Sequence, residues 1–312
     1  MIHGELNAVY SRMQMRRRYE VWFVRCGLAD GSGAWWFRHL LVQQPKTTAI
    51  NATPRYFQVW ATWFPKGEKP QTFIVNFPVE QLELSSHGEV PFHCRAPENG
   101  IEEGRCWGSL RSQGHRISWN LRIASHFGAT LSDKGWIGFS RTPHFDAEFS
   151  GRIVFDGKET SGEPLGFGVQ GHNCGYRHRT WWRWMHAYFP QAGAASTLEA
   201  LAYDLPLGLT FRNATLWHRG KGHKVEHIKE VEITRSPSRL LWKFTGQLDD
   251  GVALETFVEG LAPGVHQLPY AETDGSGTFP VSNASLARAV VRFSSGEVVE
   301  ADTGAVLEMG GR

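Results

Sequence analysis

One short segment of the chain concentrates the residues that could do chemistry. Residues 166–189, GFGVQGHNCGYRHRTWWRWMHAYF, hold three histidines, three tryptophans, three arginines, two tyrosines, two phenylalanines and one cysteine. Arginine binds acidic oxygens through forked hydrogen bonds, histidine can take up or relay a proton near neutral pH, and aromatic faces stabilise a cation. The segment is therefore a candidate for a site where aromatic rings line a cleft and polar groups are paired.

Strand periodicity divides the second part of this segment into two faces. One face holds Trp182, Trp184 and His186, and the other holds Trp181, Arg183, Met185 and Ala187. Because both faces carry aromatic residues, we expect a strand that is buried on both sides, packed in a barrel on one side and against a second domain on the other. Three arginines, Arg177, Arg179 and Arg183, could bind an anionic group of a ligand, although surface pairs with glutamate are the simpler interpretation.

Metal and nucleotide chemistry find little support in the sequence. The segment WHRGKGHKVEHI brings His218, His223 and His227 close together, but a spacing of four suits one face of a helix and this segment is expected to be strand and turn. The chain has no GxSxG, Walker or HExxH motif, and its glycine-rich stretches GSGAWW and GFGVQG precede no helix that could receive a pyrophosphate. We expect neither a metal nor another cofactor.

Composition excludes several kinds of partner. The 312 residues are 41% hydrophobic, enough for a sizeable core, and 33 basic against 31 acidic residues leave a formal charge of +2, so a nucleic-acid partner is not expected. No apolar run of about 18 residues could form a membrane-spanning segment, and the N-terminal residues lack a secretory signal, so we expect a cytoplasmic protein. The four cysteines are expected to be buried thiols. The oligomeric state stays open.

Short strands separated by Gly, Pro, Asn and Asp make up almost the whole chain. The clearest are residues 19–26, 34–43, 55–64, 71–77, 105–110, 115–123, 197–205, 209–219, 225–234, 240–246 and 252–260, with a hairpin turn at Asp156-Gly157. The sequence predicts an all-β protein of two antiparallel barrels, because closure removes exposed strand edges. We place the boundary at QAGAAS, which gives domains 1–190 and 191–312. Trp36 and Trp60, on two of the aromatic-rich strands, are candidate ligand contacts.

Three stretches in the second half of the chain carry a family resemblance. GRIVFDGKETSGEPLGFGVQGHNCG resembles the strand, DG turn, strand and terminal H-x-W-G element of the tandem lipocalin-like family, which includes carotenoid 1,2-hydratases, AttH-type proteins, tocopherol cyclase relatives and Diels–Alderases. STLEALAYDL is similar to the next strand of those proteins, and ADTGAVLEMGG to their closing strand. The resemblance begins near Gly151 and implies two lipocalin-like domains with a ligand cavity at or near their junction.

The resemblance also implies a set of site residues. The family's site histidine corresponds to His172, its tryptophan to Cys174, and a tyrosine and aspartate of the next strand to Tyr203 and Asp204. In a dry cavity Asp204 would stay protonated and could donate its proton, and His172 could relay it. Aromatic rings would stabilise the resulting cation, with Trp181, Trp182, Trp184, Tyr176 and Tyr203 as the candidates. Cys174, Tyr176, Trp182 and Trp184 are expected to contact the ligand, together with Trp36 and Trp60.

These assignments leave alternatives open. Neighbouring strand residues face opposite sides, so Tyr203 and Asp204 share one cavity only if a bulge intervenes. His172 could equally be a structural histidine with both ring nitrogens bonded. The function indicated is the binding of an apolar isoprenoid, polyene or polyketide-like molecule with its cofactor-free hydration, cyclisation or isomerisation. The alternatives are a non-catalytic lipophilic carrier or sensor and a pericyclic enzyme.

Overall fold

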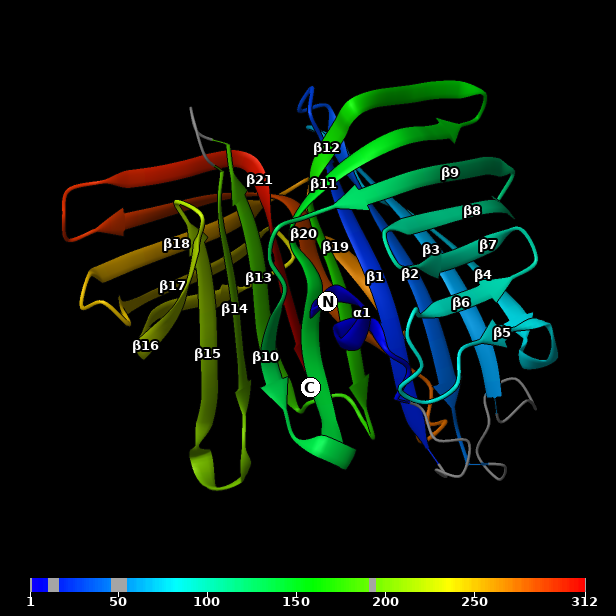
Figure 1. Ribbon diagram of the computed structural model, residues 1–312, viewed down its shortest axis with the longest axis horizontal. Helices are drawn as coiled ribbons and strands as arrows, with labels where there is room; N and C mark the ends of the chain where they lie inside the picture. The colour runs from blue at the N-terminus through cyan, green and yellow to red at the C-terminus, as the bar shows by residue number, and fades with distance from the viewer. Residues whose placement is uncertain (1, 11–16, 46–54, 191–194, 312) are drawn as a thin grey trace.

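A computed structural model describes residues 2–10, 17–45, 55–190 and 195–311. Apart from the short helix α1 (Ile2–Asn7) and three 3₁₀ turns, η1 (Val79–Gln81), η2 (Gly135–Ile137) and η3 (Pro206–Gly208), its elements are β-strands. The strands form two antiparallel sheets that lie side by side (Figure 1). The predicted all-β, two-domain lipocalin-like architecture is confirmed. None of the helices in the described ranges has the length and apolar character needed to cross a membrane.

The first sheet is a curled half-barrel. Its path runs β4-β3-β2-β1-β12-β11-β9-β8-β7-β6-β5, with β10 added beside β11, so β4 and β5 are its two ends. Its strands are β1 (Arg18–Leu28), β2 (Gly33–Gln43), β3 (Arg55–Pro65), β4 (Gln71–Pro78), β5 (Glu83–Leu84), β6 (His93–Ala96), β7 (Asn99–Glu102), β8 (Arg105–Ser112), β9 (His115–Ala124), β10 (Ala129–Asp133), β11 (Gly138–Phe155) and β12 (Lys158–Gly175). The first domain is therefore curled without the closure that we expected of a barrel.

The second sheet closes into a barrel of eight strands, because β18 pairs with β20 as well as with β17. Its strands are β13 (Trp181–Phe189), β14 (Ser196–Asp204), β15 (Thr210–His218), β16 (Lys221–Arg235), β17 (Arg239–Leu248), β18 (Ala253–Leu261), β19 (His266–Ala271), β20 (Thr278–Phe293) and β21 (Val298–Gly311). The ninth strand, β19, pairs only with β20 and extends the sheet beside the barrel.

The chain passes from one sheet to the other between Gly175 and Trp181, earlier than the expected boundary after residue 190. Strand β13 pairs with β14 and β21 and so belongs to the second sheet. Of the stretch 191–196 that we took as the linker, residues 191–194 lie outside the described ranges, and Ser196 begins β14. The change in composition at 191 comes between β13 and β14, two paired strands of the second sheet, whereas the chain changes sheet in the polar segment before β13.

Local sequence explains the best-predicted elements. Along β9, Ile117, Trp119, Leu121 and Ile123 are buried, and exposed or half-buried residues alternate with them as period two requires. The long hairpin of β11 and β12 turns at Asp156-Gly157, where both residues have positive φ, the conformation that makes DG a preferred hairpin turn. STLEALAYDL forms strand β14, as expected.

The described residues form four buried apolar clusters. Two large clusters fill the individual domains, the third lies where residues of both domains meet, and a small fourth lies on β1, β2 and β3. Strand β13 contributes to two clusters, since Met185 and Ala187 pack in the core of the second barrel while Trp182 and Trp184 join the third cluster. The prediction that this strand is buried on both faces at a domain interface is therefore confirmed.

Candidate active site at the junction of the domains

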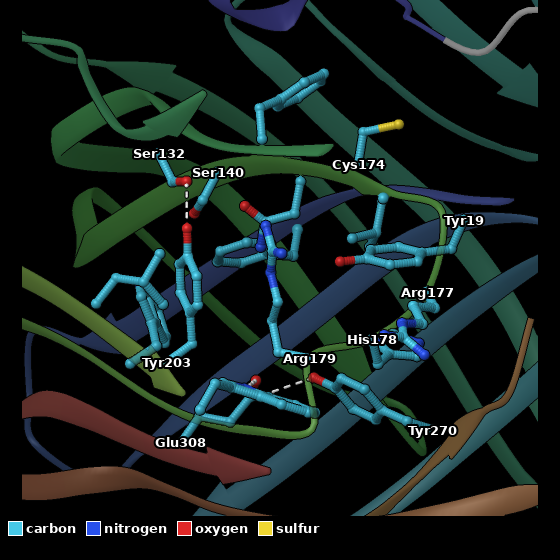
Figure 2. A pocket seen from close by; sticks show the side chains of 18 of the residues that line it. Tyr19, Ser132, Ser140, Cys174, Arg177, His178, Arg179, Tyr203, Tyr270 and Glu308 are labelled. Carbon is cyan, nitrogen blue, oxygen red and sulfur yellow. Dashed lines mark hydrogen bonds between the residues drawn. The ribbon is translucent and has the colours of Figure 1, made fainter. Parts of the chain in front are cut away.

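A cavity opens at the junction of the two sheets, with an empty volume of about 830 Å³ that includes its solvent-filled mouth. Its wall is built from β1, β2, β10, η2, β11 and β12 of the first domain, β13, β14, β19 and β21 of the second, and the connection between β12 and β13 (Figure 2). Eight aromatic rings line this wall: Tyr19, Phe23, Trp36, Phe139, Trp182, Trp184, Tyr203 and Tyr270. A hollow lined by aromatic rings and a few polar groups is typical of sites for small organic molecules.

Tyr203 presents a hydroxyl group to the cavity from β14. Its ring stacks on Phe211, with 4.6 Å between the ring centroids, and the guanidinium of Arg179 lies 4.3 Å above its centre. Its hydroxyl is 3.2 Å from the Ser132 hydroxyl of β10, so this hydrogen bond joins the two domains (Figure 2). Figure 2 shows Arg179 extending from the β12–β13 connection toward the centre of the cavity.

Glu308 is the carboxylate in the cavity wall. It lies on β21 and accepts three hydrogen bonds, from the Tyr270 hydroxyl at 2.7 Å, the Asn283 amide at 3.2 Å and the Trp182 indole N–H at 3.3 Å. Gly310, two residues further along β21, allows the Trp182 ring to lie flat here, because a Cβ atom at this glycine would come within 2.0 Å of the ring. The carboxylate is therefore fixed in position at the edge of the aromatic wall.

A stacked pair borders the mouth of the cavity. The rings of Tyr19 and His178 lie 4.3 Å apart and nearly parallel. Burial, assisted by the positive charge of Arg38, lowers the pKa of His178 to about 3, so its ring is neutral at physiological pH. Burial also raises the pKa of Tyr19 to about 12, which keeps its hydroxyl protonated. Both rings can donate or accept a hydrogen bond without adding a charge.

Two of the three catalytic residues expected from the resemblance lie outside this cavity. His172 is fully buried on the other side of β12, stacked on Trp22, where its ring nitrogens lie 2.8 Å from the Leu6 carbonyl oxygen and 2.9 Å from a Glu20 carboxylate oxygen. Asp204 is exposed, 3.5 Å from Arg183 and within reach of the Thr210 hydroxyl. Strand alternation explains the split, since Tyr203 faces the cavity and its neighbour Asp204 faces away.

The six residues expected to contact the ligand divide in the same way. Four of them, Trp36, Cys174, Trp182 and Trp184, belong to the cavity lining. Figure 2 shows the Cys174 thiol pointing away from the cavity, and its sulfur accepts a hydrogen bond from Arg18. Trp60 is buried behind the wall, in edge contact with Tyr270. Tyr176 is partly exposed and does not line the cavity.

The cavity also contains groups that the sequence analysis did not select. Arg38, Tyr270 and Glu308 come from strands far apart in the chain, and only the fold brings them together. The sequence does single out Arg38, because a charged residue inside the apolar and aromatic run AWWFRHLLV is unusual and indicates a buried polar site. Of the three arginines considered earlier, Arg177 and Arg179 line the cavity, whereas Arg183 is buried against Glu230. Arg183 therefore pairs with a glutamate as expected, although in the interior, and Arg177 is exposed.

Two of the three histidines considered for metal binding have protein partners, and His227 is exposed. His218 bonds to Ser196 and lies near Glu297, and His223 bonds to Asp249. Within the described residues a different group, His223 with Asp249 and Asp250, places potential ligand atoms within 4.8 Å of one another; both aspartates are exposed, and His223 Nδ1 lies 2.9 Å from an Asp249 carboxylate oxygen. The four cysteines are buried free thiols, as expected.

Comparison with known proteins identifies the fold. No protein-family model and no curated protein matches the chain by sequence. Among solved structures, CghA with Sch210972 is 12% identical and aligns with a TM-score of 0.64 over 94% of this chain and 88% of CghA. Kievitone hydratase from Nectria haematococca is 9% identical, with a TM-score of 0.56 over 97% and 93%. An AttH protein of Nitrosomonas europaea is 10% identical, with a TM-score of 0.58 over 97% and 94%. The chain shares the tandem lipocalin-like fold of these proteins, which confirms the resemblance at the level of the fold.

Proposed function

We propose that the junction cavity binds a predominantly apolar small molecule and catalyses its hydration, cyclisation or isomerisation without a cofactor. One observation carries this proposal, namely that the wall of the cavity combines aromatic rings with a hydroxyl and a carboxylate held in place, Tyr203 and Glu308. One of the proteins that share the fold is a hydratase, kievitone hydratase, which is in keeping with such chemistry.

Binding rests on the aromatic wall. Trp36, Trp182 and Trp184 are each less than a tenth exposed and offer large apolar faces from both domains. Burial of an apolar ligand contributes roughly 25 cal/mol for each Å² removed from water. The same ring faces would stabilise positive charge that develops in a polyene or isoprenoid during reaction.

Proton transfer is assigned to the cavity carboxylate rather than to His172 and Asp204. In isomerisation of an unsaturated carbonyl compound, the Glu308 carboxylate would take a proton from carbon while the electron pair moves to the carbonyl oxygen. The enolate oxygen would accept a hydrogen bond from the Tyr203 hydroxyl, and Glu308 would return the proton to a different carbon. In hydration of the conjugated C=C bond, water would attack the β-carbon while Glu308 takes its proton and the π electron pair moves to the carbonyl oxygen. Glu308 would then give the proton to the α-carbon. In both cases the carboxylate acts as base and then as acid.

A non-catalytic carrier is the second candidate. It is favoured by the hydrogen bonds that already occupy the reactive groups, because Glu308 accepts three donors and Tyr203 bonds to Ser132. A carrier needs only the aromatic wall and the polar groups that orient its ligand. A pericyclic enzyme would need the same features and no proton transfer.

Deuterium incorporation distinguishes these functions. The purified protein would be incubated in heavy water with a panel of isoprenoids, polyenes and unsaturated ketones, and substrate and product masses would be read. Glu308→Gln should reduce label incorporation about a hundredfold or more, the range typical of general acid–base residues. Asp204→Asn, an exposed carboxylate outside the cavity, is the matched control and should label like the natural protein.

Each outcome decides between the candidates. Equal labelling by Glu308→Gln and the natural protein would rule out Glu308 as the base. Binding without label or product would favour the carrier, and an unlabelled isomer would favour pericyclic chemistry. Circular dichroism of each variant would show that the substitution left the fold intact.

A further inference from the structure

Arg38 is a buried charge for which the described residues supply no acidic partner. Its side chain projects from β2 into the cavity wall and is 3% exposed. Its Nη1 atom has no hydrogen-bond partner, and Arg38 forms no ion pair with any other residue in the described ranges. Its contacts are aromatic, with the guanidinium carbon 4.0 Å from the ring centre of Tyr270 and 4.6 Å from that of Trp60.

Two other buried arginines show how this protein normally satisfies such a charge. Arg25, 1% exposed, donates to the carbonyl oxygens of Ser285 at 2.6 Å and Thr303 at 2.8 Å. Arg183, 3% exposed, donates two hydrogen bonds to the carboxylate of Glu230. Arg38 has no comparable oxygen partner. Because a buried charge is costly unless it is paired, and aromatic faces compensate only a part of that cost, the missing partner is expected to come from outside the chain.

A second unpaired donor lines the same cavity. The indole Nε1 of Trp36 is buried and has no hydrogen-bond partner among the residues that the structure describes, and Trp36 lies two residues before Arg38 on the same face of β2. An unpaired acceptor, Asn173 Oδ1, also belongs to the wall and suits a hydroxyl of a ligand. Burial together with the charge of Arg38 lowers the pKa of the neighbouring His178, so the field of Arg38 already acts inside the cavity.

We propose that the apolar ligand of this cavity carries an acidic oxygen group, a carboxylate or an enolate, and that Arg38 binds this anion while Trp36 donates a further hydrogen bond. Charge-assisted hydrogen bonds from a guanidinium to a carboxylate are among the strongest available to a protein. The inference rests on the proposed function, since it specifies the class of molecule that the cavity takes. An acid or an enolisable dicarbonyl compound would then be bound, and its neutral ester or alcohol would be bound less well.

The test compares one polyene in two charge states. cis-Parinaric acid and its methyl ester share the same apolar chain, and both fluoresce more strongly when they leave water. Titration of the natural protein should show at least tenfold tighter binding of the acid, equal to about 1.4 kcal/mol. Arg38→Met, which keeps an apolar stem of similar length, should weaken binding of the acid at least tenfold and leave binding of the ester within about threefold.

Further variants assign the effect to one residue. Arg38→Lys should restore a part of the preference for the acid, because it keeps the charge and loses the planar fork. Arg141→Met is the matched control, since Arg141 lies outside the cavity lining and pairs with Asp133. It should bind both probes like the natural protein. The acid-to-ester comparison needs no variant, so it stays decisive even where Arg38→Met does not fold.

The outcomes separate this inference from the proposed function. Binding of neither probe would overturn the proposed function. Equal binding of acid and ester by the natural protein would overturn the inference alone and would mean that water satisfies Arg38. A preference that survives Arg38→Met and disappears in Arg179→Met would overturn the assignment to Arg38.

Discussion

Replacing Glu199 by glutamine should remove a pH-dependent loss of stability. Glu199 lies on β14 and is 1% exposed, buried where the two sheets meet. Its carboxyl group accepts hydrogen bonds from the Thr142 hydroxyl of β11 at 2.6 Å and from the Trp184 indole N–H of β13 at 2.7 Å. Burial raises the pKa of Glu199 to about 7, and the two hydrogen bonds act in the opposite direction. At neutral pH the buried contact between the two sheets therefore contains a carboxyl group that is close to ionisation.

The sign and size of the effect follow from this pKa. The folded state holds the proton more tightly than the unfolded chain, so the stability contributed below about pH 4.5 is lost as the pH rises toward 7. A rise in pKa from 4.5 to about 7 amounts to about 3 kcal/mol at about 1.4 kcal/mol per pH unit. Glutamine resembles the protonated acid in shape and can keep both hydrogen bonds. The stability of Glu199→Gln relative to the natural protein should therefore increase by about 2–3 kcal/mol between about pH 5 and pH 8.

Urea unfolding of both proteins at the two pH values measures this difference directly. Other titrating groups cancel in the comparison, and Glu226→Gln, an exposed position on β16, controls for the loss of a negative charge. A difference in unfolding free energy that stays constant from about pH 5 to pH 8 would refute the reasoning, because it would show that burial does not hold the proton on Glu199.

Two further predictions concern buried charges. Arg183→Met should lower the free energy of unfolding by about 3 kcal/mol, because it leaves the Glu230 carboxylate, whose side chain is only 9% exposed, paired with Arg212 alone. Arg212→Met, at a more exposed position, should lower it by less than about 1 kcal/mol. Equal losses for the two variants in urea unfolding would contradict this account. Burial lowers the pKa of His39 to about 3, so the folded state resists protonation and loses stability as the pH falls below about 6.5. His39→Leu should reduce that loss by about 1.4 kcal/mol per pH unit between about pH 6 and pH 4, and an unchanged slope in urea unfolding would show that His39 is not responsible.

The interior of the fold was largely predictable because it depends on local pattern. Alternation along β9 and the DG turn between β11 and β12 are encoded within a few residues. The burial of both faces of β13 could likewise be predicted, because aromatic residues occur on each face. The point at which the chain changes sheet was not, since both flanking segments are strands and only their pairing partners differ.

The site was less predictable than the fold. Tyr203 and the tryptophans Trp182 and Trp184 line the cavity as expected, whereas His172 lies on the opposite side of β12. There its contacts with Leu6 and Glu20 tie helix α1 to β1 and β12, an arrangement typical of a structural histidine. Sequence neighbours on a strand face opposite ways, so an error of one residue in register exchanges a cavity residue for a core or surface residue.

Many short antiparallel strands, aromatic residues at the contact between two domains and nearly balanced charges can all be inferred from the amino-acid sequence. Which polar groups meet at that contact depends on the folded arrangement of the two sheets. Arg38, Tyr270 and Glu308 come from β2, β19 and β21, and no local pattern records that they face one cavity. The physical reason is that strand alternation is a local property of the backbone, whereas the neutralisation of a buried charge depends on partners that long-range sheet pairing brings together.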